Sequence, residues 1–199
     1  MPKKMKDSAL VVVDMLYDFI DGSMACREAD EAVRGSLRYI EDVTRDTDPD
    51  DSGIRSIFPI LFVCDHHPAD HCSFTSQGGP WPPHCVQGTR GAEIHEALRP
   101  YAAEDLVFCK GEDPSREQYS GFEGRNAAGQ SLSEVLHLLE IRRVVLCGIA
   151  TEFCVRNTAE DLLKDGFQVE VLRDCIAYVE AEGHRKALEE MASEGIRIV

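Results

Sequence analysis

The chain has 199 residues, of which 43% are hydrophobic and 29% are charged, and its formal net charge is −15. This composition is typical of a folded globular protein, and the strong negative charge argues against nucleic acid and anionic membrane surfaces as partners. No apolar run is long enough for a membrane span or for the core of a signal peptide, so we expect a cytoplasmic protein without a membrane partner.

Six short apolar runs, most of them rich in β-branched residues, are predicted to form strands. They cover residues 9–13, 58–64, 106–109, 143–149, 168–173 and 196–199. Helical patterns are found at residues 131–140, 151–166 and 183–195. Alternating strands and helices predict a doubly wound α/β fold, with a six-stranded, mainly parallel sheet and helices on both faces. We expect a single domain over residues 1–199.

Two polar segments interrupt this alternation. The acidic stretch at residues 41–51 is interpreted as a solvated loop or helix end that needs no function. Residues 65–92 are rich in Gly, Pro, Ser and His, and a loop of this length inside a compact domain is usually functional. It overlaps the stretch FVCDHHPADHC, at residues 62–72. Taken alone, this stretch does not distinguish a metal site from a redox switch or a solvated loop.

Chemically active side chains follow four of the predicted strands. Asp14, Asp65 and Lys110 come directly after the first three, and Cys154 lies just beyond the fourth, in the first turn of a helix. The carboxyl ends of parallel strands meet at one edge of the sheet, where ligands bind in open α/β folds. We therefore expect these four side chains to share a cleft.

Cys154 is the candidate nucleophile of that cleft. Thr151 is a candidate N-cap, so the sulfur would lie near the positive end of the helix dipole, which together with Lys110 predicts a lowered thiol pKa. Asp14 could take the thiol proton and return it to a leaving amine. The small residues of the turn at 148–150 would allow backbone amides to face a developing oxyanion.

Four blocks of sequence surround these residues. The first block is the aspartate that ends the first strand, followed four residues later by Asp-Phe (Asp14, Asp18, Phe19). The second combines DHHP from Asp65 with WPPHCVQG from Trp81. The third is KGEDPSREQYSGF from Lys110, and the fourth is GIATEFCV from Gly148. Together these blocks resemble the isochorismatase-like cysteine hydrolases, and within them the nicotinamidases, also called pyrazinamidases. The resemblance implies a Rossmann-like fold and an amidohydrolase that converts nicotinamide to nicotinate and ammonia in NAD salvage. It also implies a cysteine thioester intermediate, activity on pyrazinamide, and a homo-oligomer.

The resemblance assigns roles to individual residues. The implied catalytic triad is Asp14, Lys110 and Cys154. The implied oxyanion hole consists of the backbone amides of Ala150 and Cys154, with a cis peptide between Ile149 and Ala150. The implied metal ligands are Asp65, His67 and His84. The implied walls of the pyridine pocket are Phe19, Trp81 and Tyr119.

One divalent metal per chain is therefore expected, held in a loop insert at about residues 65–92. One carboxylate and two imidazoles suit Zn²⁺, with Fe²⁺ and Mn²⁺ as alternatives. Since a cysteine supplies the nucleophile, the expected role of the metal is a template for the ring nitrogen of nicotinamide. His71 is interpreted as a further ligand or as a hydrogen-bonding partner of the ligands. His66 is interpreted as a bystander, because adjacent residues of an extended chain point to opposite sides.

The chain departs from the family pattern at a few positions. Leu16 and Tyr17 stand where glutamine and asparagine are usual, His66 stands in place of an aromatic residue, and Glu152 in place of aspartate. The departures at residues 16, 17 and 66 are expected to lie near the pocket and to bear on substrate choice.

Other functions stay open at this point. One is a different hydrolase of the superfamily, acting on another small amide or on isochorismate, although the isochorismate branch lacks the metal site. Another is a non-catalytic metal or redox sensor that uses the cysteine-rich loop. The sensor does not explain why Asp14 and Lys110 lie at the ends of distant strands.

Overall fold

A six-stranded sheet forms the centre of the computed structural model, which describes residues 7–45 and 58–199. The strands lie in the order β3 (Val107–Lys110), β2 (Ile60–Asp65), β1 (Ser8–Val13), β4 (Arg143–Gly148), β5 (Gln168–Ile176) and β6 (Arg197–Ile198). Every pairing among these strands is parallel. The predicted doubly wound α/β fold is therefore confirmed.

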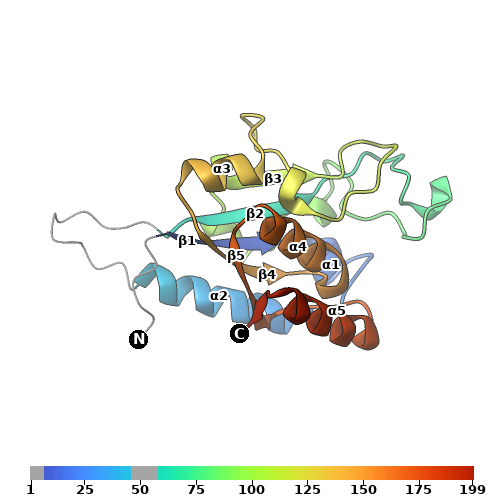
Figure 1. The fold of residues 1–199 in the computed structure, drawn as a ribbon. Coiled ribbons are helices and arrows are strands. Elements are labelled where there is room, and N and C mark those ends of the chain that lie inside the picture. The colour runs from blue at the N-terminus through green and yellow to red at the C-terminus, as the bar shows by residue number, and fades with distance from the viewer. Residues whose placement is uncertain (1–6, 46–57) are drawn as a thin grey trace.

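Helices cover both faces of this sheet (Figure 1). One face packs against α1 (Tyr17–Ile20) and α2 (Ala29–Arg45), and the other packs against α3 (Leu132–Leu138), α4 (Arg156–Lys164) and α5 (Ala181–Glu194). Alternate residues of a strand point to opposite faces, so in β1 Val11 joins one core and Val12 joins the other. Both faces of the central strands are thus buried, which explains their unbroken apolar runs.

Helix α2 was not among the predicted elements, although its buried residues follow helical spacing. They are Ala29, Ala32, Val33, Ser36 and Ile40. Most are small, so the apolar stripe gives a weak signal in the sequence. A small residue is required at Gly35, where a Cβ would lie 2.3 Å from the carbonyl oxygen of Asp174 in β5. The acidic stretch closes this helix at residues 41–45, and its remainder, residues 46–51, lies outside the described residues.

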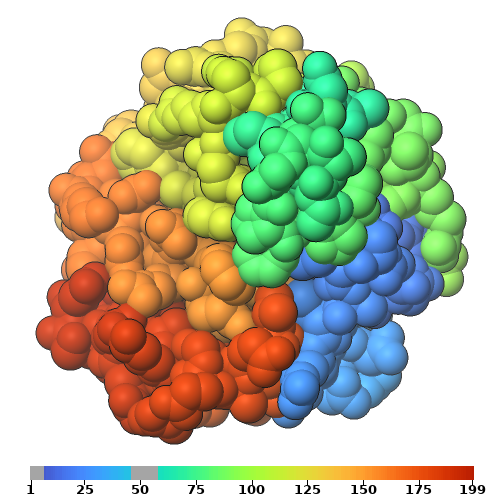
Figure 2. Space-filling model, turned by 90° about the vertical axis from the view of Figure 1, so that its right-hand side faces the viewer, coloured from blue at the N-terminus to red at the C-terminus, as the bar shows by residue number. Residues whose placement is uncertain are grey.

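The segment between β2 and β3 is the longest irregular part of the described chain. It runs from residue 66 to residue 106 and contains four short 3₁₀ turns, so it is longer than the predicted loop at 65–92. It lies at the carboxyl end of the sheet, where the chain segments around residues 15, 80 and 150 come together in Figure 2. None of the helices in the described ranges has the length and apolar character needed to cross a bilayer.

Candidate active site

Three buried ionisable side chains meet at the carboxyl ends of β1, β2 and β3. Asp14 follows β1, while Asp65 and Lys110 are the last residues of β2 and β3 and lie opposite each other in the register of the sheet. The Lys110 ammonium is 3.0 Å from a carboxylate oxygen of Asp14, and it also pairs with the Asp65 carboxylate. The side chains of Asp14 and Lys110 are fully buried. Strand order therefore brings together residues that are up to 96 positions apart in the sequence.

Lys110 holds this cluster in its charged state. Burial lowers the pKa of Lys110, but the Asp14 and Asp65 carboxylates outweigh it, and the pKa lies well above its ordinary value. Burial likewise opposes ionisation of Asp65, yet the neighbouring ammonium keeps the pKa of that carboxyl well below its usual range. The site thus combines one ammonium with two carboxyl groups that are buried from bulk solvent.

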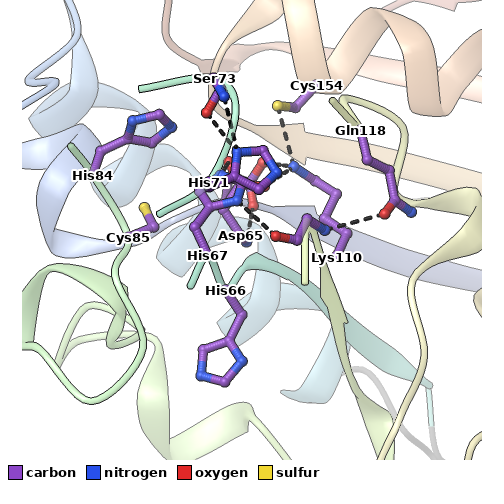
Figure 3. A network of polar contacts seen from close by, with 12 residues as sticks. Asp65, His66, His67, His71, Ser73, His84, Cys85, Lys110, Gln118 and Cys154 are labelled. Carbon is purple, nitrogen blue, oxygen red and sulfur yellow. Dashed lines mark hydrogen bonds and ion pairs between the residues drawn. The ribbon is translucent and has the colours of Figure 1, made fainter. Parts of the chain in front are cut away.

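Cys154 places its sulfur 3.4 Å from the Lys110 ammonium (Figure 3). Its sulfur and one carboxylate oxygen each of Asp14 and Asp65 lie within 4.8 Å of one another. The predicted lowering of the thiol pKa is wrong for this structure. Burial raises the pKa of Cys154 well above its ordinary value, Lys110 opposes the rise, and the two carboxylates add to it. The thiol therefore holds its proton until a base removes it.

Asp14 has the properties of that base. One carboxylate oxygen accepts a hydrogen bond from the Asp65 amide at 2.8 Å, and this bond fixes the carboxylate toward Lys110 and Cys154. Burial raises the pKa of Asp14 to about 6, with the Asp65 charge adding to the rise and Lys110 opposing it. A carboxyl group with this pKa is ionised at neutral pH and can still accept a proton readily.

The helical segment that carries Cys154 begins differently from the sequence-based expectation. Residues Thr151–Val155 form a π-helical turn that leads into α4, and its N-cap is Ala150 rather than Thr151. The Thr151 hydroxyl instead donates to the Ala177 carbonyl at 2.9 Å, which ties the turn to the end of β5. Cys154 is consequently the fourth residue of the helical segment. The turn keeps its sulfur aimed at Lys110.

The backbone before this turn has the geometry that the resemblance implied. The peptide between Ile149 and Ala150 is cis. Gly148 adopts φ 132°, and a Cβ there would lie 2.0 Å from the Val13 carbonyl oxygen, so only glycine fits between β1 and β4 at this point. The Ala150 amide lies immediately before the π-helical turn and donates to no acceptor in the described part of the chain.

Asp65, His67 and His84 form a second, overlapping cluster. One potential ligand atom from each lies within 4.8 Å of the others, and the His67 Nε2 atom is 3.5 Å from an Asp65 carboxylate oxygen. The Nδ1 atom of His67 pairs with the Gly111 carbonyl and that of His84 with the Pro82 carbonyl, both at 2.8 Å. These bonds leave the Nε2 atoms of both rings as acceptors, as in metal sites where the other ring nitrogen donates to a carbonyl.

Gly111 makes the position of His67 possible. Its φ is 69°, and a Cβ at this residue would lie 2.3 Å from the His67 ring. The glycine that follows Lys110 therefore lets the imidazole pack directly against the backbone of the neighbouring loop. Its amide is held by the Gln118 side chain at 3.1 Å, which fixes the loop on the other side.

His71 lies beside this cluster but turns its ring nitrogens elsewhere. Its Nδ1 atom pairs with the Ser73 hydroxyl at 2.7 Å, and its Nε2 atom pairs with the Arg116 carbonyl at 3.0 Å. The ring packs 4.2 Å, between centroids, from that of His67. With both nitrogens engaged, His71 supports the position of His67 in this structure and does not present a ligand atom. The ring of His66 points away from the cluster (Figure 3).

An aromatic pocket opens next to Cys154. The expected residues Phe19, Trp81 and Tyr119 all line it, together with His84, Ala150 and Cys154. Sequence reasoning missed Phe153, whose ring meets that of Trp81 edge-on at a centroid distance of 5.2 Å and that of Tyr119 at 5.4 Å. The Trp81 ring nitrogen also donates to the Tyr119 hydroxyl at 3.2 Å. Phe153 comes immediately before the nucleophile in the sequence, and this position is the signal that could have identified it.

The residues that depart from the family pattern do not form the described walls of this pocket. Leu16, Tyr17 and His66 are not among its described lining residues. Leu16 is fully buried in the core, and the Tyr17 ring packs against that of His95 with an angle of 43° between the ring planes. Glu152 accepts hydrogen bonds from the amides of Val179 and Glu180, and so holds the segment between β5 and α5 against the turn of Cys154.

The chain is similar to known proteins along almost its whole length. Residues 8–199 match the isochorismatase domain family. The chain is 36% identical to the nicotinamidase/pyrazinamidase of Mycobacterium tuberculosis, over 96% of this chain and 97% of that one, and 34% identical to the nicotinamidase of Escherichia coli, over 85% and 83%.

Solved structures share its fold as well, and two complexes are among them. The zinc complex of the Pyrococcus horikoshii pyrazinamidase superposes with a TM-score of 0.83 at 40% identity, covering 97% of this chain and 98% of that one. The nicotinate complex of PnC1 from L. infantum gives a TM-score of 0.80 at 32% identity, covering 100% and 95%.

Proposed function

Because the chain belongs to the isochorismatase family, we propose that its site hydrolyses the carboxamide of nicotinamide, and also that of pyrazinamide. One observation carries this proposal. The Cys154 sulfur, the Lys110 ammonium and the Asp14 carboxylate converge at one edge of a pocket that is walled by Phe19, Trp81 and Tyr119. A flat aromatic ring fits such a pocket, and the nucleophile lies at its side.

The first half of the proposed reaction forms a thioester. Asp14 removes the thiol proton as the Cys154 sulfur attacks the carboxamide carbon, and the carbonyl oxygen becomes an oxyanion. The amides of Ala150 and Cys154 are the proposed donors to that oxyanion. When the intermediate collapses, the C–N bond breaks, and the leaving nitrogen takes the proton from Asp14 and departs as ammonia.

The second half regenerates the enzyme. Asp14 removes a proton from water as the water oxygen attacks the thioester carbon, the C–S bond breaks, and the Cys154 sulfur recovers a proton while the acid is released. The Lys110 ammonium lies 3.0 Å from the Asp14 carboxylate and 3.4 Å from the sulfur, so its charge offsets the negative charge that passes between these two groups. The sum is one amide and one water converted to one acid and one ammonia.

Asp65, His67 and His84 fit a divalent metal ion. The hydrogen bonds from the Nδ1 atoms to backbone carbonyls fix both rings in the tautomer that leaves Nε2 free to bind, and the nearby carboxylate completes a set suited to Zn²⁺. When bound, such an ion supplies a Lewis-acidic position for the ring nitrogen of the substrate at the pocket wall formed by His84. His71 is left out of the proposed ligand set because both of its nitrogens are engaged.

The proposed enzyme is one domain whose long segment between β2 and β3 is a metal-binding insert. The homo-oligomer that the resemblance implies and the cytoplasmic location expected from the sequence remain predictions.

Kinetics on three amides test this proposal. Nicotinamide and pyrazinamide both carry a ring nitrogen, whereas benzamide has nearly the same shape without it. If ring stacking alone held the substrate, the three amides would have similar kcat/KM values, since they bury similar apolar area. We expect ammonia release from nicotinamide and pyrazinamide, and a kcat/KM for benzamide lower by about a hundredfold, because benzamide lacks the atom that orients its carboxamide toward Cys154. Benzamide turnover within a few-fold of nicotinamide would contradict the role of the ring nitrogen. Absence of ammonia release from nicotinamide by metal-loaded protein would contradict the function itself.

A further inference from the structure

A third group of side chains with potential metal-ligand atoms lies outside the proposed active site. It consists of His66, Cys109 and Glu112, and one potential ligand atom from each lies within 4.8 Å of the others. The His66 Nδ1 atom is 2.9 Å from a Glu112 carboxylate oxygen. Their side chains are 35% and 53% exposed, and Cys109 is a half-buried free cysteine. Three different donor types thus converge at the surface.

Strand geometry separates this group from the catalytic residues. Asp65 and Lys110 are opposite each other in the register of β2 and β3, and their side chains meet on one face of the sheet. Side chains alternate along an extended chain, so Cys109, which precedes Lys110 in β3, and His66, the residue after β2, are directed to the other face. Figure 3 shows the His66 ring directed away from His67, His71 and His84.

The donor set is selective in its chemistry. Imidazole, thiolate and carboxylate together favour Zn²⁺ and related transition metals over Mg²⁺ or Ca²⁺, which prefer oxygen ligands. Three protein ligands leave a position for water. Cys109 and Glu112 also line an open surface pocket, which gives a hydrated ion a path to the group. The net charge of −15 favours the approach of cations.

We propose that His66, Cys109 and Glu112 form a second transition-metal site, distinct from the one formed by Asp65, His67 and His84. An ion bound there joins His66, which follows β2, to Cys109 and Glu112, which lie on either side of Lys110 and Gly111. It clamps the ends of these strands from the face opposite to the catalytic one. Its role is to stabilise the frame that holds Asp65 and Lys110, and it makes no contact with substrate.

Cobalt absorption distinguishes the two sites. The set Asp65, His67 and His84 contains no thiolate, so Co²⁺ bound there gives no thiolate-to-cobalt charge-transfer band, whereas Co²⁺ on Cys109 does. Cys154 is removed first, as Cys154→Ala, to exclude a contribution from the catalytic thiol. We expect the band in Cys154→Ala, and we expect it to be lost when Cys109→Ser is added. Cys72→Ser is the matched control, because Cys72 is also a half-buried free cysteine but belongs to none of the three ligand groups found among the described residues.

Metal stoichiometry provides an independent measurement. In the Cys154→Ala background, dialysis against buffered free Zn²⁺ followed by elemental analysis is expected to give two ions per chain, and one after Cys109→Ser or His66→Phe is added. The affinity for the second ion should fall by on the order of a hundredfold in either variant. Far-UV circular dichroism of each variant reports folding. Persistence of the cobalt band in Cys109→Ser, or a single ion per chain in folded Cys154→Ala at saturating Zn²⁺, would overturn the proposal.

Discussion

Eight free cysteines are found in this chain, and their surroundings set one of them apart. Cys64 and Cys147 lie inside strands and belong to the hydrophobic core, and burial raises the pKa of each thiol. Cys154 is equally buried, but it faces an ammonium at 3.4 Å and has a carboxylate nearby that can receive its proton. The difference between a packing residue and a nucleophile is here a difference in neighbours and not in exposure.

Removing the Cys154 thiol should abolish turnover. We expect Cys154→Ala to lower kcat by at least about a thousandfold, since no other group can form the thioester. The measurement is steady-state ammonia release, with folding checked by circular dichroism. Cys72→Ala is the control and should keep most of its activity, because Cys72 lies outside the site. Substantial turnover by Cys154→Ala would show that the nucleophile is another group.

The protonation state of Asp14 should control the acid limb of the pH profile. The pKa of Asp14 is about 6, and the mechanism needs the ionised carboxylate, so protonation at lower pH removes the base. We expect kcat/KM to be level near neutral pH and to fall by about tenfold for each pH unit well below this pKa. Asp14→Asn should have little activity at any pH. A profile that stays flat far below pH 6 would mean that Asp14 is not the base.

The strands and helices that could be predicted from the sequence are those whose buried residues are large and apolar. The six strands were found because runs such as residues 9–13 are β-branched and buried on both faces. Helix α2 was missed because its buried face consists of small residues such as Ala32 and Ser36. Strand β5 extends to Ile176, beyond the predicted end at residue 173, since after a register shift between Leu146 and Gly148 its pairing with β4 resumes at Ile176.

In the site, too, features that depend on neighbouring residues in the sequence could be predicted, and features that depend on contacts between distant segments could not. Residues with a distinctive chemistry at strand ends, such as Asp14 and Lys110, could be identified from the sequence together with family resemblance. The pKa of Cys154 could not, because it depends on how deeply the thiol is buried and on two carboxylates that reach it from other strands. Phe153 was missed for a similar reason, since its pocket partners Trp81 and Tyr119 come from distant loops.

The N-terminus of α3 offers a test of local stability. The Ser131 hydroxyl accepts a hydrogen bond from the Glu134 amide, and the Glu134 side chain accepts one from the Ser131 amide, which together form a capping box. We expect Ser131→Ala to lower the free energy of unfolding by about 1 kcal/mol, measured by urea denaturation. Ser193→Ala, inside α5, is the control and should change stability little. Equal effects of the two substitutions would contradict the capping contribution.

At the scale of the whole molecule, the proposed metal site ties two distant parts of the long insert together. His84 lies 17 residues beyond His67, and the segment around them has no strand or long helix of its own among the described residues. An ion shared by these residues therefore replaces part of the stabilisation that regular secondary structure would give.

Removal of the metal should therefore affect stability as well as activity. A ligand present at 100 times its dissociation constant stabilises the native state by about 2.7 kcal/mol, and each kcal/mol shifts the Tm of a protein of this size by roughly 2–4 °C. We expect chelation to lower the Tm by several degrees and to abolish ammonia release, with Zn²⁺ restoring both. His84→Ala should lower the metal content of the site, while His137→Ala, an exposed histidine paired with Asp165, should not. Unchanged Tm and activity after complete chelation would exclude a role for the metal.

The central position of β1 has a consequence for the synthesis of the chain. This strand is paired with β2 on one side and with β4 on the other, so an element near the N-terminus is completed only by residues 143–148. During translation the growing chain cannot complete the pairing of β1 until residues 143–148 have left the ribosome, and such long-range pairing slows folding. Asp14 is made 140 residues before Cys154. A nascent chain that stops short of Cys154 therefore carries the base without its nucleophile, and no hydrolytic chemistry is possible at that stage.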